Sequence, residues 1–415
     1  MDTNIEVPPF FLCPISLEIM KDPVTISTGI TYDRESIEKW LFSGKNTTCP
    51  VTKQVVKDSE LIPNITLRRV IQSWCTVNAS SGIERFPTPK APISKPQLVK
   101  LLNEAQRSPQ MQMECLRRLR SIASHHETNK RCMENVGAAD FLASIVNNIG
   151  DNHDICEDSS IMSESTKARD EALSLLCHLQ LSEDGLKSLI EKNNAKFINS
   201  LVRVMQRGNF ESRAYAVMLL KSITQVVDPT HWTNLKTEFF VELVQILNDQ
   251  ISDKASKATL KILINVCPGG RNRIKAVEAG VVPVLIDHLI DSFEKRASEM
   301  MLIVLEQLCQ CAEGRAELLK HSAGLAIVSK KILRVSQVAS DRAVKILHSI
   351  SKFSATNSVV QEMLSLGVAA KLCLVLQVDC GSKTKERARE ILKLHARIWK
   401  NSPCLPMNLL SSLPC

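Results

Sequence analysis

The chain has 415 residues, with 52 Lys and Arg against 44 Asp and Glu, a formal net charge of +8 and 4% aromatic residues. This length exceeds what one hydrophobic core usually fills, so we expect two or more structural units. The charge excess is too dilute over the chain to indicate a nucleic-acid-binding protein, and a mildly basic surface accounts for it.

Cysteine usage and the first residues bear on the cellular compartment. The 14 Cys are scattered at irregular spacing, which favours reduced thiols over a disulfide framework. The opening "MDTNIEVPPFFLCPIS" lacks a basic start followed by an apolar stretch. Aliphatic runs such as "MMLIVL" are far shorter than the ~20 residues that span a bilayer. We expect a cytoplasmic protein with no transmembrane segment, and the nucleus stays open as a second location.

A first folded segment is predicted over residues 9–78. "VTISTGITYD" alternates β-branched residues around Gly29 and predicts a short hairpin. "DRESIEKWLFSG" predicts a helix with Asp33 as its cap and Gly44 at its end. "NITLRRVIQSWC" predicts a second helix. Two loops, containing "LCPISLE" and "TCPVTKQ", flank the hairpin and the first helix.

A proline-rich stretch, "ASSGIERFPTPKAPISKP", follows and carries four prolines. Each proline fixes its own φ and disfavours helix in the residue before it. We therefore expect a linker over residues 79–97, either a semi-rigid spacer or a strap along a neighbour. Residues 1–78 carry 8 basic and 9 acidic side chains, so the whole basic excess lies after this boundary.

Residues 98–400 show a helical pattern that repeats. Amphipathic stretches recur with a basic residue followed by Ala at the same place, in steps of 41, 42, 46 and 45 residues. Between them, a short helix ends near a glycine and a longer apolar helix follows, around Gly137, Gly280, Gly324 and Gly367. Such steps are typical of armadillo or HEAT solenoids. We count about six repeats after an N-terminal cap.

Residues 147–166 interrupt this pattern with a polar, acidic and aperiodic sequence, for which we expect a flexible insert. Its "SSIMSEST" part, at 159–166, offers hydroxyl groups for phosphorylation. Short tails without repeats are expected at 1–8 and 401–415.

The two Cys-Pro pairs of the N-terminal segment first suggest a zinc-binding RING finger. A RING needs about eight Cys or His ligands, since structural zinc is fully coordinated. Residues 10–76 hold only Cys13, Cys49 and Cys75 and no His. Two closed zinc sites are therefore arithmetically impossible, and we expect neither a metal nor a cofactor.

The segment resembles the U-box, a metal-free relative of the RING domain found in ubiquitin ligases. The resemblance rests on "LCPIS", "DPV", "GITYDRESIEKWL", "TCPVTK" and "IPNITLRRVIQSW". With the repeats after it, the chain is similar to plant U-box/armadillo E3 ligases, in the subgroup associated with negative regulation of immune and drought responses. The implied fold is a small α+β U-box, zinc-free and RING-like, followed by an all-α armadillo-repeat solenoid.

The resemblance implies an apolar groove that binds a ubiquitin-conjugating enzyme (E2). The residues that match its two loops and helix are Ile15, Leu17, Pro50, Val51 and Trp40. Trp40 could equally be a core residue, as large aromatic side chains in small domains often are.

Two further roles follow from the same resemblance. Lys53 matches a basic residue that bridges E2 and ubiquitin and holds the thioester in a reactive pose, although a solvated surface lysine is an open alternative. Polar interactions would replace zinc as the scaffold, and ordinary capping and turn roles are the alternative for them. The scaffold candidates are Cys13, Asp22, Arg34 and Asn64.

The implied activity is direct transfer of ubiquitin from the E2 thioester to a substrate lysine. A ligase that carries ubiquitin on its own cysteine needs an activated thiolate, and Cys13 and Cys49 lie in segments without His. The repeats would bind the substrate on their concave surface. The outcome would be degradation of a signalling or trafficking component, and self-association through the U-box is left open.

Two other functions were weighed against the ligase. Import receptors with armadillo repeats carry a ladder of Trp and Asn on successive third helices. After residue 80 this chain has only Trp232 and Trp399, neither in the helices with the basic–Ala pair. That ladder is therefore absent, which speaks against an import receptor, and a non-catalytic armadillo scaffold or adaptor stays the alternative function. A U-box protein that assembles complexes without transferring ubiquitin is not separated from a ligase by its sequence.

Overall fold

The structure is a computed structural model that describes residues 6–44, 46–56, 60–89, 92–148, 159–233, 235–292 and 294–399. It divides into two compact units. The first holds the strands, helices α1 to α5, the start of α6, and α7, and the second holds the rest of α6 and α8 to α21. The expected tail at 401–415 and most of that at 1–8 lie outside the described residues.

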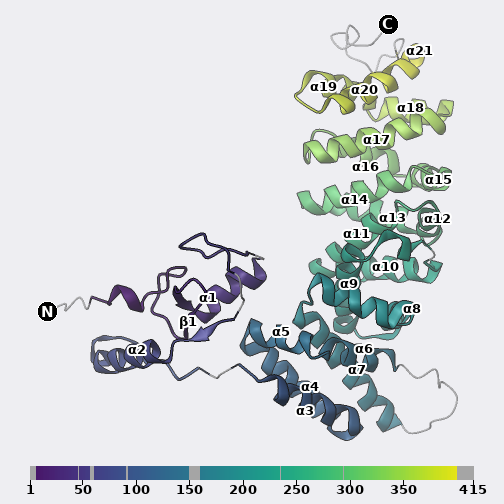
Figure 1. Cartoon of the computed structure of the whole chain (residues 1–415). Helices are drawn as coiled ribbons and strands as arrows, with labels where there is room; N and C mark the ends of the chain where they lie inside the picture. Colours follow the sequence, from purple (N-terminus) through teal and green to yellow (C-terminus); the bar gives the residue numbers. More distant parts are fainter. Residues whose placement is uncertain are drawn as a thin grey trace. The chain divides into compact units, whose positions relative to one another are not determined.

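The N-terminal segment is built on a small antiparallel sheet with strand order β2-β1-β3 (Figure 1). The strands are β1 (Pro23–Thr25), β2 (Thr31–Asp33) and β3 (Ile62–Pro63). The predicted hairpin is confirmed, and Gly29 turns it with a φ of 82°, which glycine adopts without a steric penalty. Strand β3 was not predicted because its two residues are too few to show an alternating pattern.

Two predicted helices pack on this sheet. Helix α1 (Arg34–Glu38) continues as a π-helical turn, η2 (Lys39–Ser43), and ends at Gly44 as predicted. Helix α2 (Ile65–Val77) begins after Asn64, whose Oδ1 accepts the Leu67 N–H at 3.0 Å as an N-cap. Short 3-10 helices, η1 (Pro9–Phe11) and η3 (Ala79–Ser81), flank the segment. The buried core consists of Phe11, Cys13, Met20, Val24, Ile26, Tyr32, Ile37, Leu41, Cys49, Ile71 and Cys75.

The described part of the proline-rich linker is a strap along the N-terminal segment. Ile83 and Phe86 pack against its core, and the Lys21 ammonium lies 5.1 Å from the centroid of the Phe86 ring. Helix α3 (Lys95–Arg107) begins within the expected linker, with Pro96 in its first turn. Proline is favoured there because it has no N–H to leave unpaired, so the last residues of the expected range are helical.

The first unit continues with helices that pack around α4. Helix α4 (Pro109–His125) packs against α5 (Glu127–Asn135) and α7 (Ser159–Leu179), and α6 (Ala138–Asn147), between them in the chain, is shared by the two units. The expected insert at 147–166 is wrong in its second half, because α7 already begins at Ser159. That half contains neither Gly nor Pro, so nothing in it stops a helix that packing stabilises further along. Residues 149–158 of the insert lie outside the described residues.

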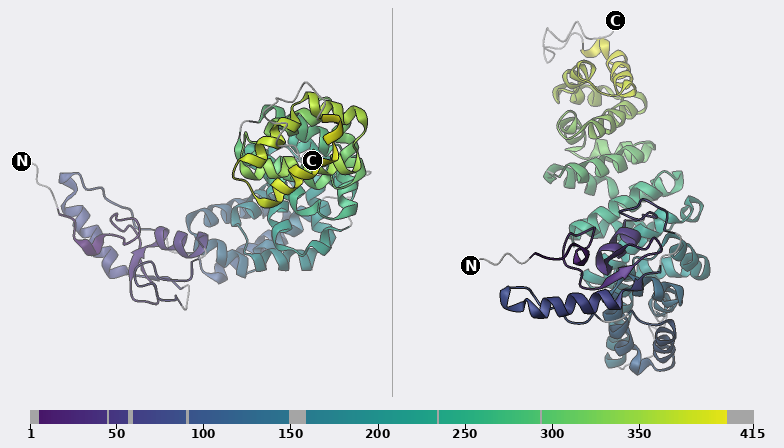
Figure 2. Two further views of the ribbon diagram at one scale, coloured as in Figure 1. Left: turned by 90° about the horizontal axis from the view of Figure 1, so that it is seen from above. Right: turned by 60° about the vertical axis from the view of Figure 1, so that its left-hand side comes forward.

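Helices of the second unit follow one another in chain order along a stack (Figure 2). They are α8 (Glu183–Arg207), α9 (Phe210–Val226), η4 (Pro229–Trp232), α10 (Thr237–Asp249), α11 (Asp253–Val266), α12 (Gly270–Glu278), α13 (Val281–Asp291), α14 (Lys295–Leu308), α15 (Ala312–Lys320), α16 (Gly324–Lys331), α17 (Gln337–Phe353), α18 (Asn357–Ser365), α19 (Val368–Gln377), α20 (Ser382–Leu394) and α21 (Ala396–Trp399).

The third helices of successive repeats form one layer in this stack. Helices α9, α11, α14, α17 and α20 each pack against the next, and all five predicted basic–Ala pairs lie on them. Trp232 and Trp399 are buried in η4 and α21, away from this layer, as the sequence indicated. Among the described residues, no single helix is long and apolar enough to cross a membrane. Only α18 and α19, bent by 64° between them, meet that test as a pair.

The predicted glycine turns are confirmed, but for two different reasons. Gly280 and Gly367 precede second helices with φ values of 86° and 70°, in the left-handed region that favours glycine. Gly324 instead opens α16 at a close approach, where a Cβ would lie 2.0 Å from the Leu318 carbonyl oxygen.

Candidate functional site

The two loops of the N-terminal segment share one pattern of backbone hydrogen bonds. In the first loop (residues 12–19), Leu17 N–H donates to the Cys13 carbonyl at 2.8 Å and Cys13 N–H to the Glu18 carbonyl at 2.8 Å. In the second loop (residues 48–55), Lys53 N–H donates to the Cys49 carbonyl at 3.0 Å and Cys49 N–H to the Gln54 carbonyl at 2.8 Å. Isolated β-bridges close both loops.

Each loop also holds one residue in the left-handed region. Leu17 has a φ of 60° and Lys53 a φ of 59°, which is uncommon for residues other than glycine. The two loops are therefore local repeats of one turn, and Leu17 and Lys53 occupy equivalent places in them.

Cys13 and Cys49 are fully buried, and their sulfur atoms accept hydrogen bonds. Cys13 Sγ accepts the Asp33 N–H at 3.3 Å. Cys49 Sγ lies 3.0 Å from the Tyr32 hydroxyl and accepts the Thr52 N–H at 3.4 Å. Tyr32 and Asp33 are neighbours on β2, so this strand ties both loops. The described residues hold no group of three or more His, Cys, Asp and Glu side chains able to bind a metal.

The electrostatics of the Cys49 thiol are unusual. Burial raises its pKa, but hydrogen bonds from the residues around it outweigh burial and lower the pKa to about 6. Burial, together with the hydrogen bond to Cys49, raises the pKa of Tyr32, so the phenol stays protonated as a donor. Because Cys49 is 0% exposed, its sulfur has no access to a thioester, and it serves the scaffold.

An ion network joins two of the scaffold candidates, Asp22 and Arg34, which lie outside both loops. Arg34 Nε donates to Asp22 Oδ2 at 2.6 Å, and Arg68 Nη1 lies 3.6 Å from the other oxygen of Asp22. Arg34 and Asp22 are 3% and 8% exposed, so each charge depends on its partner. This is the place at which sequence reasoning expected polar groups instead of zinc.

The structural roles of two carboxylates next to this network, Asp33 and Glu38, were not predicted. Asp33 occupies the cap position of α1 without a capping side-chain bond. Its Oδ1 accepts the N–H groups of Lys21 and Asp22 at 2.8 and 3.0 Å. Glu38 lies 3.7 Å from Arg34 and accepts the Glu127 N–H of α5 at 2.8 Å. No sequence pattern could show this bond, because it joins residues 89 positions apart.

Trp40 is hydrogen-bonded to the second loop. Its Nε1 donates to the Thr48 carbonyl at 2.8 Å, and the Lys53 ammonium lies 6.0 Å from its ring centroid, near the limit of a cation–π contact. The ring also packs partly buried against the core. The two interpretations of Trp40, as core and as surface, therefore describe different parts of one side chain.

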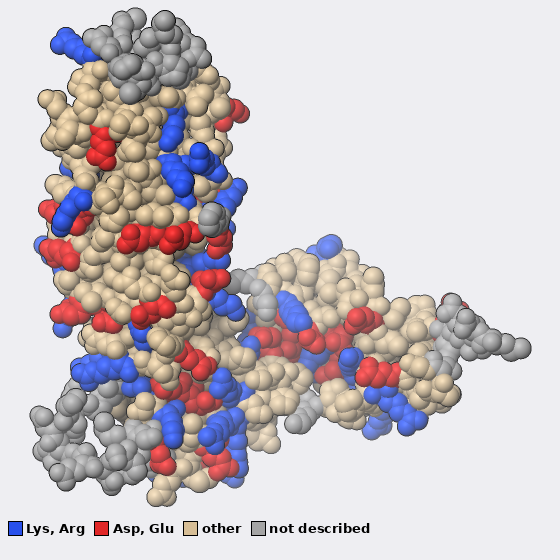
Figure 3. Space-filling model, turned by 180° about the vertical axis from the view of Figure 1, so that it is seen from behind, with Lys and Arg blue, Asp and Glu red and all other residues tan. Residues whose placement is uncertain are grey.

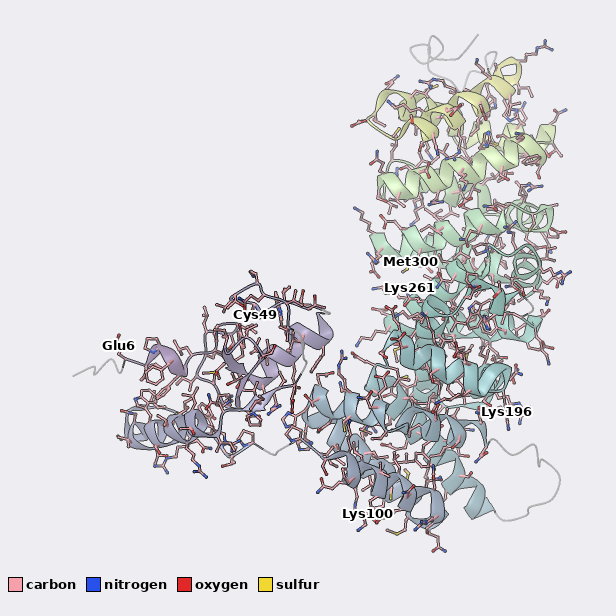
Figure 4. The ribbon with its side chains drawn as sticks, in the orientation of Figure 1. Glu6, Cys49, Lys100, Lys196, Lys261 and Met300 are labelled. Carbon is pink, nitrogen blue, oxygen red and sulfur yellow. The ribbon has the colours of Figure 1, made fainter. Side chains whose placement is uncertain are left out.

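The remaining docking candidates lie at the loop tips. Leu17 and Val51 are 74% and 51% exposed, while Ile15 and Pro50 are half-buried. Large apolar side chains at such exposure in turns suit a protein partner. Figure 4 marks Cys49 at the base of the second loop.

Comparisons with known proteins identify the class of both parts. Residues 7–80 match the model of the U-box domain, and residues 97–415 match the model of the ARM repeat region of plant U-box proteins. Among solved structures, one from work on the interaction between cadherin and β-catenin has a TM-score of 0.61 at 13% identity. It covers 86% of this chain and 62% of its own, which shows the armadillo fold alone.

Two relatives from Arabidopsis thaliana match over the whole chain. The E3 ubiquitin-protein ligase PUB23 is 58% identical over 419 residues, covering 100% of this chain and 99% of the relative. The E3 ubiquitin-protein ligase PUB22 is 56% identical over 434 residues, with 100% of both chains covered. The chain belongs to the plant U-box/armadillo E3 ubiquitin-protein ligases, and an E2 is accordingly the partner of its U-box.

Proposed function

We propose that the two loops and Trp40 form the surface that binds the E2. The observation that carries this proposal is the pairing of two identical turns, whose tips present Ile15 with Leu17 and Pro50 with Val51. The scaffold beneath them is buried and hydrogen-bonded to both loops through Tyr32 and Asp33, so the tips are held in place before binding. Preorganised surfaces lose less free energy to ordering when a partner binds.

We infer that Lys53 acts in positioning rather than in chemistry. It is exposed beside Trp40, where an ammonium can donate hydrogen bonds to both E2 and ubiquitin. Ubiquitin then passes directly from the E2 thioester to a substrate lysine, with no covalent intermediate on this chain. Holding both reactants on one scaffold makes the attack effectively intramolecular.

The armadillo repeats, in this proposal, bind the substrate, and transfer marks it for degradation. A role in plant immune and drought signalling, in the cytoplasm and also the nucleus, rests on the family resemblance. Self-association through the U-box is a further element of the proposal. Imaging of a fluorescent fusion in plant cells, before and after an immune or drought stimulus, tests the location.

Self-ubiquitination of the purified chain tests the activity. The chain is mixed with activating enzyme, a panel of E2s, ubiquitin and ATP, with and without a zinc chelator. Ile15→Ala should lower the rate at least ~10-fold, the size expected for a central apolar contact. Val77→Ala, which truncates a 79% exposed residue of α2, serves as the matched control and should leave the rate unchanged.

The outcomes separate the competing functions. Activity that survives chelation and falls only in Ile15→Ala supports the proposal. Absence of transfer with every E2, in a chain that circular dichroism shows to be folded, would favour a scaffold without transfer. Loss of activity on chelation would contradict the metal-free site.

A further inference from the structure

Neighbouring third helices of the second unit are tied by a recurring hydrogen bond. Asn265 in α11 donates from Nδ2 to the Thr224 carbonyl in α9 at 3.4 Å. Ser349 in α17 donates from Oγ to the Cys309 carbonyl after α14 at 2.9 Å. Each bond sets how far one helix is shifted along the other. The residues that precede the bonded pair by about one helical turn, one on each helix, therefore also lie next to each other.

At the junction of α14 and α17, the residues one turn earlier have opposite charges. Glu306 precedes Cys309 by three residues and Lys345 precedes Ser349 by four. Lys345 Nζ lies 2.5 Å from Glu306 Oε1, and Arg342 Nη1 lies 3.0 Å from Glu306 Oε2. Glu306 is only 4% exposed. This junction neutralises its own buried charge.

At the junction of α9 and α11, the corresponding residues are both lysines. Lys221 precedes Thr224 by three residues and Lys261 precedes Asn265 by four. Both lysines are half-buried. Within the described ranges, neither side chain has a hydrogen bond or an ion pair. Burial and the nearby charge of Lys261 lower the pKa of Lys221. Like charges held together in partial burial disfavour each other, and an anion between them would relieve this.

The surroundings of the two lysines are apolar. Met218 and Ile264 are half-buried on α9 and α11. Gln307 donates to the Ile264 carbonyl at 3.1 Å, which places Ile303 of α14 at the position that Lys261 has in α11. Figure 4 marks Lys261 on α11 and Met300 on the adjacent α14. A further cation on α11, Lys257, lies one turn before Lys261 and is paired with Glu294 at 2.8 Å, so its charge is already compensated.

The charges on one face of the molecule show no continuous basic tract of the kind that binds nucleic acid. On the face in Figure 3, acidic and basic side chains are interspersed. Nucleic acid is typically bound along a continuous basic tract that neutralises successive phosphates. Two cations with aliphatic neighbours instead suit a short segment in which acidic and apolar residues alternate.

We propose that Lys221 and Lys261 bind an acidic segment of the substrate protein, through its carboxylate or phosphate groups. The proposal rests on the repeats' proposed role in substrate binding, and it concerns binding alone. In the free protein, no acidic side chain among the described residues pairs with these two lysines. The ligand supplies the acidic group, as Glu306 does between α14 and α17.

Fluorescence anisotropy with the full chain tests this directly. One labelled peptide alternates Asp and Glu with Leu, a second carries phosphoserine at the acidic positions, and a third carries Lys there. Lys221→Glu recreates the Glu306–Lys345 arrangement, so it should keep the fold and lower affinity for the acidic peptides at least ~10-fold. Lys330→Glu on α16, an exposed site with the same charge change, should leave affinity unaltered.

Each outcome bears on the proposal. Binding of an acidic peptide, lost in Lys221→Glu with an unchanged or higher melting temperature, supports it, and the preferred peptide distinguishes carboxylate from phosphate. Equal losses in Lys221→Glu and Lys330→Glu, binding of the Lys peptide, failure of both acidic peptides to bind, or stronger competition by a single-stranded oligonucleotide would each overturn it. Self-ubiquitination of the same variants is measured in parallel, so a failure of the ligase itself is seen separately.

Discussion

The two loops of the U-box have the same backbone but are held by different side chains. The first loop is held by the Asp33 N–H at Cys13, next to the ion pair of Asp22 and Arg34. Aromatic side chains hold the second loop, with the Tyr32 hydroxyl at Cys49 and the Trp40 indole at Thr48. Two zinc sites of a RING are thus replaced by two distinct devices. Charge pairing lies beside one loop, and hydrogen bonds from ring side chains to the Cys49 sulfur and the Thr48 carbonyl hold the other.

The loops differ again at their tips. Ile15 and Val51 occupy equivalent apolar places, whereas the left-handed position holds Leu17 in the first loop and Lys53 in the second. At this position the first loop therefore offers an apolar contact. The second can also donate hydrogen bonds to a partner.

The largest effect is expected from breaking the ion network. Arg34→Ala leaves Asp22 buried without its principal partner, which should cost about 3–5 kcal/mol of U-box stability. Lys39→Ala is the control, because its pair with Glu35 is exposed and such pairs contribute at most about 1 kcal/mol. Hydrogen exchange read by mass spectrometry should show faster exchange across β1 and α2 in Arg34→Ala alone. Unchanged exchange would show that the network is dispensable.

Cys49 should make the stability of the second loop dependent on pH. Its folded pKa of about 6 lies below the ordinary thiol value, so the folded state binds fewer protons between the two values. This contribution to stability is complete above the unfolded thiol's pKa and is lost as pH falls through about 6. Urea denaturation across this range should show stability rising with pH.

Substitution by serine tests whether Cys49 causes this dependence of the free energy of unfolding on pH, the slope of stability against pH. Cys49→Ser should remove it. Cys75→Ser should act in the opposite sense, because burial raises the pKa of Cys75 and ionisation at high pH disfavours the folded state. The same slope in Cys49→Ser and the native chain would refute the assignment.

A smaller effect should separate the loops from each other. Tyr32→Phe removes the hydroxyl bonded to Cys49 and to the Val51 N–H, at a cost of about 1–2 kcal/mol. Amide exchange should accelerate in the second loop and stay unchanged in the first. Equal acceleration in both loops would mean that they are not independently supported.

The smallest change relieves strain. A residue other than glycine in the left-handed region costs about 1–2 kcal/mol, and the larger chain entropy of unfolded glycine takes back about 0.5–1 kcal/mol of this gain. Leu17→Gly and Lys53→Gly should therefore each raise the midpoint of thermal unfolding only slightly. Both should also lose ligase activity, because the side chain that meets the partner is gone. A fall in both midpoints would show that other contacts of these side chains dominate.

Local patterns predicted most of this architecture from the sequence. Alternation around Gly29, the helix end at Gly44 and the recurring basic–Ala pair each depend on residues close in the chain, so these predictions hold in the structure. The failures lie where distant contacts decide. Strand β3 exists only through pairing with β1, Glu38 meets α5 only after folding, and α7 extends to Ser159 because its later turns pack on α4.

In the candidate site, too, features set by local sequence could be predicted, whereas those set by distant contacts could not. The loop tips and their types of residue could be predicted, since "CPIS" and "CPVT" stand in the sequence itself. The roles of Tyr32 and Asp33 could not, because they depend on β2 running between the loops. The count of possible zinc ligands needed only composition, which is why it was the firmest exclusion.

The most direct test of the account is the discharge of ubiquitin from a preformed E2 thioester to free lysine, measured against U-box ligase concentration in a single turnover. The account predicts that Ile15→Ala raises the ligase concentration needed for half-maximal rate while the maximal rate is kept. Lys53→Ala should lower the maximal rate at an unchanged half-maximal concentration. Equal effects of both variants on apparent affinity would contradict the assignment of binding to Ile15 and of positioning to Lys53.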